Sequence, residues 1–179
     1  MYNIYIICKN NDIFIKKKEM FKGHSTINSI HWIPSEFLKV TDNNKTQLLS
    51  MLNTRYNTSE KNRISKLGCI AAHRKALLSI INNQTTNNII LEEDATLLND
   101  LPNTPPNVSC YLGGWIIPPH ISKANKVKID LPKLFNNDIN SIDYSKFKIL
   151  MAHSYFIKSI EEVENILLST IGKIKNYDV

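Results

Sequence analysis

The sequence predicts an α/β domain with a mixed, mostly parallel sheet, and two neighbouring segments support this. Between Ile64 and Ile81 the apolar residues recur at helical spacing, and after a polar loop Ile89–Leu91 is a short continuous apolar run. Such a run is typical of a strand buried on both faces of a partly parallel sheet. Helix, loop and strand together form an α/β unit. The 179 residues are expected to form one domain, residues 1–179.

The first part of the chain predicts two strands. Asn3–Cys8 is rich in β-branched and aromatic residues and leads into Lys9–Asp12, which we interpret as a turn. Ile27–Ile33 is the second expected strand, closed by Pro34. The basic run Lys16–Lys18 between them is interpreted as a solvated turn.

The long helix expected between Ile64 and Ile81 has an apolar stripe that also includes a histidine. His73 falls on the same face as Ile70 and Leu77, so its ring is expected to point toward the interior or the rim of a cleft. The apolar residues assigned to the stripe are Ile64, Leu67, Ile70, Ala71, Leu77, Leu78 and Ile81.

Two strands and a helix are expected in the last third of the chain. Val108–Leu112 predicts a strand stopped by Gly113 and Gly114, and Ile149–Ile157 predicts another. Ser159–Glu162 has the pattern of a capping box, which opens a helix running to about Lys175. The buried stripe expected for that helix is Ile160, Val163, Leu167, Ile171 and Ile174.

Composition narrows the class of protein. Hydrophobic residues make up 42% and charged residues 21%, which argues against wholesale disorder, a collagen and a polytopic membrane protein. The net charge of +6 favours an anionic partner: nucleic acid, a phosphorylated small molecule or an acidic membrane surface. Aromatic residues do not alternate with basic ones as in a nucleic-acid stacking platform, so specific nucleic-acid binding ranks below the other functions.

The cysteines and the N-terminus indicate a reducing, cytosolic setting. Cys8, Cys69 and Cys110 are far apart and lack the close pairing of zinc sites or disulfide frameworks, so we expect three small buried residues. The opening segment is too short and polar for a signal peptide, and no apolar run has the length of a transmembrane span.

The most informative chemistry lies where the buried strand ends. Ile89–Leu91 runs directly into Glu92, Glu93 and Asp94, and ligands of open α/β sheets bind beyond the carboxyl ends of strands. Oxygen ligands suit Mg²⁺ or Mn²⁺ held against a phosphate. The alternative interpretation of these three acids is the start of a solvated turn. His73 and His153 have a similar alternative, a hydrogen-bonded histidine with a structural role.

Four ordered segments resemble glycosyltransferase family 25, the lipopolysaccharide-biosynthesis and collagen galactosyltransferases. Lys66–Ala76 is similar to the family's helix with Gly-Cys, small residues and His, and Leu91–Asp94 to its strand ending in Glu-Asp-Asp. Tyr111–Gly114 is similar to its Leu-Gly-Gly segment, and Ala152–Ile157 to its His-Ala-Tyr-Leu-Ile segment.

The resemblance implies a single Rossmann-like nucleotide-sugar transferase domain of the A type that uses Mn²⁺ or Mg²⁺. In that reading the metal bridges the donor diphosphate and neutralises the leaving group. Metal ligands would be Asp94, Glu93 and His153, and donor-binding residues Gly68, His73, Glu92, Gly113 and Gly114. No residue is assigned as catalytic base.

The expected function is therefore a cytoplasmic glycosyltransferase that moves a hexose from a nucleotide sugar, expected to be UDP-linked, to a glycan or protein acceptor. The sequence departs from the family in three places. Lys9–Asp12 follows the first strand, where the family has an Asn-Leu and arginine-bearing turn. Glu93 stands where the family usually has Asp, and the chain ends at Val179, where family members generally continue. The alternative is therefore a degenerate, inactive member that binds a sugar nucleotide or acts as an interaction module.

Overall fold

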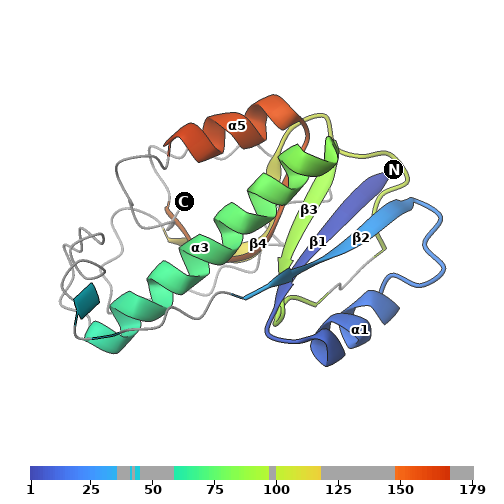
Figure 1. Cartoon of the computed structure of the whole chain (residues 1–179). Helices are drawn as coiled ribbons and strands as arrows, with labels where there is room; N and C mark the ends of the chain where they lie inside the picture. Colours follow the sequence, from blue (N-terminus) through green and yellow to red (C-terminus); the bar gives the residue numbers. More distant parts are fainter. Residues whose placement is uncertain (36–40, 42, 45–58, 97–99, 118–147, 170–179) are drawn as a thin grey trace.

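The computed structural model describes residues 1–35, 41, 43–44, 59–96, 100–117 and 148–169. Within them the elements form one α/β arrangement (Figure 1). The strands are β1 Tyr2–Cys8, β2 Ile27–Pro34, β3 Asn88–Glu92, β4 Cys110–Ile117 and β5 Lys148–Ile157. The main helices are α1 Asn11–Glu19, α3 Glu60–Asn83 and α5 Ile160–Ser169.

The described strands make a five-stranded mixed sheet in the order β2-β1-β3-β5-β4. β1 pairs in parallel with β2 and with β3, whereas β5 pairs antiparallel with both β3 and β4. The predicted mixed α/β sheet is confirmed: pairing is parallel among β2, β1 and β3, the first strands of the chain, and antiparallel on both sides of β5. The carboxyl ends of β1, β2 and β3 therefore meet at one edge of the sheet.

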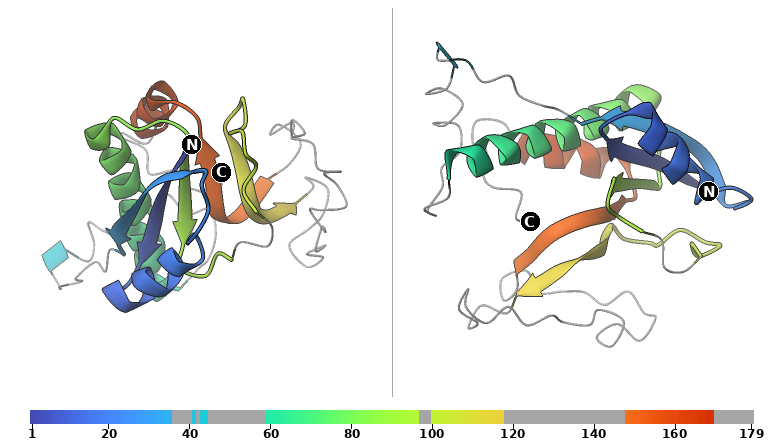
Figure 2. Two further views of the ribbon diagram at one scale, coloured as in Figure 1. Left: turned by 90° about the vertical axis from the view of Figure 1, so that its right-hand side faces the viewer. Right: turned by 90° about the horizontal axis from the view of Figure 1, so that it is seen from below.

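Both faces of the sheet are covered. Alternate residues of β1 point to opposite faces, so Tyr5 and Ile7 pack into one hydrophobic cluster and Ile4 and Ile6 into another. The first cluster includes the buried side of α3 and Val163 of α5, which lie side by side on that face (Figures 1 and 2). The second is covered by residues of α1 and the segment after it. β1 is buried along its whole length and pairs with β2 and β3, so it positions the ends of these two strands beside its own.

Helix α1 is the element that the sequence analysis did not predict. The turn expected at Lys9–Asp12 is wrong, because the Asn10 side chain caps a helix by accepting a hydrogen bond from the Ile13 N–H at 3.0 Å. Lys16–Lys18, interpreted as a solvated turn, lies instead in the last turn of α1, where positive charge is favourable.

The helix predicted between Ile64 and Ile81 is confirmed, but it is longer than expected and its buried face is rotated from the expected one. α3 spans Glu60–Asn83, and its stripe was misassigned at Leu78, which is 51% exposed, whereas Ile80 is fully buried.

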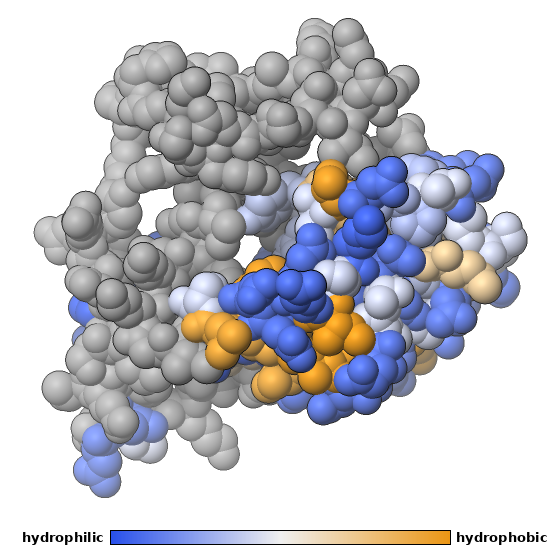
Figure 3. Space-filling model, turned by 90° about the horizontal axis from the view of Figure 1, so that it is seen from above, coloured by the Kyte–Doolittle hydropathy of each residue, from blue (hydrophilic) through white to orange (hydrophobic). Residues whose placement is uncertain are grey.

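Figure 3 shows hydrophilic side chains over much of the described surface seen from above, with hydrophobic ones gathered in a limited area. No helix among the described residues is long and apolar enough to cross a bilayer.

The predicted end of the fourth strand is wrong. Gly113 and Gly114 do not stop the strand, because β4 continues through them to Ile117 and pairs with β5. Its register shifts on both sides of Gly113, as in a β-bulge, which a glycine accommodates without ending the strand.

The predicted capping box at the start of α5 is confirmed. The Glu162 N–H donates to Ser159 Oγ at 3.2 Å, and the Ser159 N–H donates back to Glu162 Oε2 at 3.1 Å. Ser109 Oγ donates to the same carboxylate at 2.6 Å and so ties the start of β4 to α5. The expected helix end near Lys175, with Ile171 and Ile174, lies outside the described residues.

Glu162→Gln is expected to destabilise the protein at neutral pH but much less in acid. Partial burial acts to raise the pKa of Glu162, yet hydrogen bonds from Ser109, Ser159 and Lys158 outweigh it and lower this pKa below its ordinary 4.5. A carboxyl group with a lowered folded pKa stabilises above its unfolded pKa and loses this effect as pH falls through the folded value. We expect a loss of about 1 kcal/mol in the free energy of unfolding at pH 7.

Urea unfolding at pH 7 and pH 3 checks this, with Glu161→Gln, the exposed neighbouring acid, as the matched control. An equal loss for Glu162→Gln at both pH values would show that the charged form of Glu162 adds no stability.

Candidate functional site

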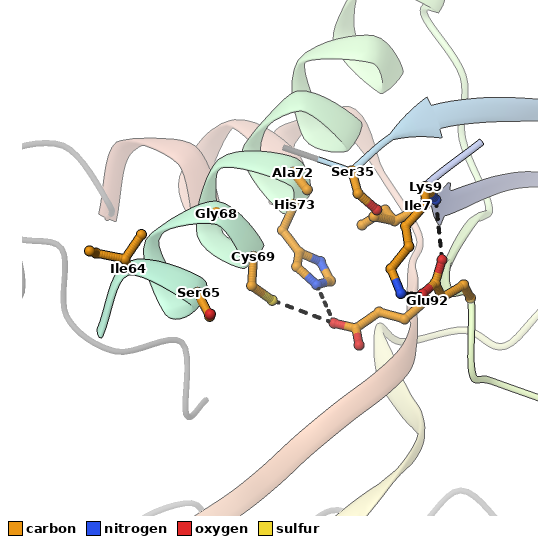
Figure 4. Close-up of a pocket in the computed structure, with 11 residues that line it drawn as sticks. Ile7, Lys9, Ser35, Ile64, Ser65, Gly68, Cys69, Ala72, His73 and Glu92 are labelled. Carbon is orange, nitrogen blue, oxygen red and sulfur yellow. Dashed lines mark hydrogen bonds and ion pairs between the residues drawn. The ribbon is translucent and has the colours of Figure 1, made fainter. Parts of the chain in front are cut away.

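A cavity of about 300 Å³ lies beyond the carboxyl ends of the parallel strands. Lys9 follows β1, Ser35 follows β2, and Glu92 and Glu93 stand at the end of β3. The opposite wall is the first half of α3, from Ile64 to His73 (Figure 4). This is the crevice in which ligands of open α/β sheets bind, and its volume is at the small end of ligand sites.

His73 is the centre of the hydrogen bonding in the cavity. Its Nε2 lies 2.8 Å from Glu92 Oε1, and its Nδ1 lies 2.9 Å from the Tyr155 hydroxyl oxygen. The two rings also stack, with centroids 5.6 Å apart. The expectation that His73 points to the rim of a cleft is confirmed, because it is 8% exposed and lines the cavity.

Cys69 joins the same group one helical turn before His73. Its thiol donates to Glu92 Oε1 at 3.6 Å, and the Cys69, His73 and Glu92 ligand atoms all lie within 4.8 Å of one another (Figure 4). The expectation of three buried cysteines is wrong here: Cys8 is buried, but Cys69 is exposed and Cys110 half-buried. The reason is that Cys69 lies on the cavity side of α3, which the sheet does not cover.

The thiol of Cys69 is held in its protonated form. The residue as a whole is exposed, but partial burial of the thiol is the first cause that raises its pKa. The charges of Glu92 and Asp94 and the hydrogen bond to Glu92 add to it, so the pKa of Cys69 rises to about 12. Cys69 is therefore a hydrogen-bond donor in this protein rather than a free nucleophilic thiolate.

Glu93 forms an ion pair with Lys9 at the end of β1. Lys9 Nζ lies 2.7 Å from Glu93 Oε1, and the Lys9 backbone N–H donates to Glu93 Oε2 at 3.1 Å. The side-chain bond to Lys9 is the main reason that the pKa of Glu93 is lowered, and the same bond raises the pKa of Lys9. Carboxylate and ammonium both stay charged at neutral pH.

Asp94 lies in the turn that follows β3. This turn is closed by the Ala95 N–H, which donates to Glu92 O at 3.0 Å, and Lys17 Nζ bonds to Ala95 O. Asp94 is exposed, and among the described residues the cavity lining at this strand end consists of Glu92 and Glu93. Its charge nevertheless acts on Cys69, so Asp94 lies close to the cavity.

The remaining predicted site residues have three different outcomes. Gly68 lines the cavity beside Cys69, as expected for a donor-pocket residue. Gly113 and Gly114 lie in β4; Gly113 pairs with Ser154 of β5, which pairs with Leu91, so Gly113 is level with the end of β3 but separated from it by β5, and neither glycine is among the described residues that line the cavity. His153 lies in β5, and its side chain is outside the described residues. The ligand roles of Asp94, Glu93 and His153 stay predictions.

Among the described residues, three that hydrogen-bond within this site were missed by sequence reasoning: Lys9, Cys69 and Tyr155. For Cys69 a signal was present, because a cysteine and a histidine four residues apart share a helical face. Lys9 is the first residue after a strand that ends beside the acids. Tyr155 could be found only from strand register, since it pairs with Ile90 and so shares a sheet face with Glu92.

No protein-family model matches this chain, and no curated protein matches it. The resemblance to glycosyltransferase family 25 therefore rests on the four quoted segments and their order.

Proposed function

We propose that the chain is a metal-dependent glycosyltransferase that moves a hexose from a nucleotide sugar, UDP-linked by preference, to a glycan or protein acceptor. The observation that supports it best is the position of the strand-end acids: Glu92 and Glu93 line a cavity at the carboxyl ends of three parallel strands. A nucleotide diphosphate with a divalent ion is the kind of ligand that this edge of an α/β sheet accommodates.

The residues at the strand end fit a hard divalent ion. Glu93 and Asp94 offer adjacent carboxylates, and oxygen ligands of this kind suit Mn²⁺ or Mg²⁺. When bound, the ion would neutralise charge on the leaving nucleoside diphosphate. Glu93 shares its carboxylate with Lys9 at present, so metal binding requires this ion pair to open or to share an oxygen.

Lys9 has a role of its own in this proposal. Its ammonium lines the cavity opposite α3 and is protonated at neutral pH, since its ordinary pKa of 10.5 is already far above 7 and Glu93 raises it further. Released from Glu93 by a metal, it would provide a positive charge for the diphosphate oxygens. The apolar part of the wall, Ile7, Ile64 and Ala72, gives the uncharged part of a ligand a surface to pack against.

Isothermal titration of UDP with and without Mn²⁺ tests the proposal. We expect UDP binding to depend on the metal. Asp94→Ala should weaken it by more than about 100-fold, because removing a direct metal ligand costs more affinity than removing a residue that only hydrogen-bonds to a ligand. Asp100→Ala removes an exposed aspartate of the loop before β4 and is the matched control, expected to bind as the native chain does. CMP and GDP are titrated in parallel.

Failure of all three nucleotides to bind a chain that circular dichroism shows to be folded would refute the proposal. Equal affinity for the native chain and Asp94→Ala would refute the assignment of the metal ligand.

A second candidate, a degenerate domain that binds a sugar nucleotide without turnover, is favoured by one observation. Both acids in the cavity are already engaged, Glu92 by His73 and Glu93 by Lys9. Metal-dependent hydrolysis of the donor sugar separates the two candidates: turnover that Asp94→Ala removes indicates the transferase, and binding without turnover indicates the degenerate domain.

A further inference from the structure

Three potential metal ligands of different chemistry converge at one corner of the cavity. Cys69 and His73 come from consecutive turns of α3, and Glu92 comes from the end of β3 (Figure 4). One ligand atom of each residue lies within 4.8 Å of those of the other two, and Glu92 Oε1 lies 2.8 Å from His73 Nε2 and 3.6 Å from Cys69 Sγ. We propose that Cys69, His73 and Glu92 form a zinc-binding site with its fourth coordination position open to the cavity.

The donor set selects the metal. Zinc accepts sulfur, nitrogen and carboxylate oxygen, and its catalytic sites have three protein ligands and one open position. A thiolate and an imidazole are poor ligands for Mg²⁺ or Mn²⁺, which prefer oxygen. Two ligands four residues apart on one helical face are a spacing that zinc sites use. With Cys69 as thiolate and Glu92 as carboxylate, the protein would supply two negative charges to balance the two positive charges of the ion.

The histidine is already held in the orientation that a metal site requires. Its Nδ1 is hydrogen-bonded to the Tyr155 hydroxyl at 2.9 Å, and the Tyr155 ring stacks on it. Metal-binding histidines are usually oriented by such a bond at the other ring nitrogen. In the metal-free chain Nε2 faces the Glu92 carboxylate, which can only accept, so Nε2 carries the ring proton there. Metal binding therefore requires the other tautomer of the ring, in which Nδ1 carries the proton and donates it to the Tyr155 hydroxyl, and Nε2 offers its lone pair to the ion. Because His73 is nearly buried, its ring has little freedom to turn away.

Loading the site exchanges a proton for the metal. In the structure Cys69 donates its thiol proton to Glu92 Oε1, the same oxygen that contacts His73 Nε2. Zinc binding breaks the S–H bond, releases this proton to solvent and places the ion among the three atoms now joined by hydrogen bonds. A water or an oxygen of a cavity ligand completes the coordination.

This inference does not rest on the proposed transferase activity. Glu93 and Asp94, the ligands proposed for Mn²⁺, are not among the three residues, and no nucleotide takes part. The two proposals can therefore be refuted independently. A chain that does not bind zinc can still be tested for metal-dependent UDP binding, and a chain that does not bind UDP can still be tested for zinc binding.

Cobalt and zinc titrations of the metal-free protein test the site. Co²⁺ bound by a thiolate gives a charge-transfer band in the near ultraviolet, and Zn²⁺ affinity follows from competition with a chromophoric chelator. We expect one equivalent of each metal to bind and Zn²⁺ to displace Co²⁺. Cys69→Ser should abolish the charge-transfer band, and Glu92→Gln should weaken zinc binding by more than about 100-fold. Tyr155→Phe, which leaves all three ligands, should weaken it by about 10-fold.

Two controls make the result specific. Cys110→Ser removes a half-buried thiol in β4, and Glu161→Gln removes an exposed acid of α5 that does not line the cavity; both variants should bind cobalt and zinc as the native chain does. Absence of a stoichiometric cobalt or zinc complex in the folded native chain would overturn the proposal. So would a charge-transfer band that persists in Cys69→Ser, because its thiolate would then come from elsewhere.

Discussion

Leu77→Ala is expected to lower the free energy of unfolding by about 2–5 kcal/mol. Leu77 is fully buried in the cluster that joins α3 to the sheet, where it is grouped with Tyr5 and Ile90 of the two central strands. Removing its branched end leaves a space that the rigid strands beneath it cannot close, so packing is lost in addition to the burial of the side chain itself. Urea unfolding followed by circular dichroism measures the loss.

Leu78→Ala is the matched control, since it makes the same chemical change one residue further along the same helix. Leu78 is 51% exposed, so its truncation should change stability by no more than about 0.5 kcal/mol. Comparable losses for the two variants would contradict the orientation of α3 described above. That orientation also determines the site, because it turns Cys69 and His73 toward the cavity.

Segments whose pattern reflects burial could be predicted from the sequence. β1 and β3 are apolar runs because both of their faces are covered, and the capping box at Ser159 is a local pattern that depends on four residues alone. α1 could not be predicted in the same way. None of its residues is fully buried, so it has no strong apolar stripe, and its main local signal is the capping side chain of Asn10.

The candidate site was predicted in part for a similar reason. Glu92, Glu93 and His73 are visible because charged or polar residues at a strand end or on an apolar helix face are unusual. Lys9 and Tyr155 reach the site through pairing between segments far apart in the chain, at 84 residues for Lys9 and Glu93 and 82 for His73 and Tyr155. Such contacts depend on strand order and register, which the local sequence does not specify.

His73→Phe is expected to lower the free energy of unfolding by about 1–3 kcal/mol, although it keeps a ring of similar size. The phenyl ring can still stack on Tyr155, but it removes the hydrogen bonds to the Tyr155 hydroxyl and to Glu92 Oε1. A polar group that loses its hydrogen-bond partner where water has little access lowers the free energy of unfolding. Urea unfolding measures the loss, and His31→Phe is the control.

His31 is a suitable comparison because its ring also stacks on a tyrosine, Tyr5, with centroids 4.6 Å apart, and bonds to Ser29 Oγ. It lies half-exposed on β2, where water can replace the lost bond, so the change should stay below about 0.5 kcal/mol. A double-mutant cycle with Tyr155→Phe then isolates the His73–Tyr155 bond, and we expect a coupling of about 0.5 kcal/mol or more. Additive losses in that cycle would mean that Tyr155 does not hold the ring, which would remove the orienting bond on which a metal at Nε2 depends.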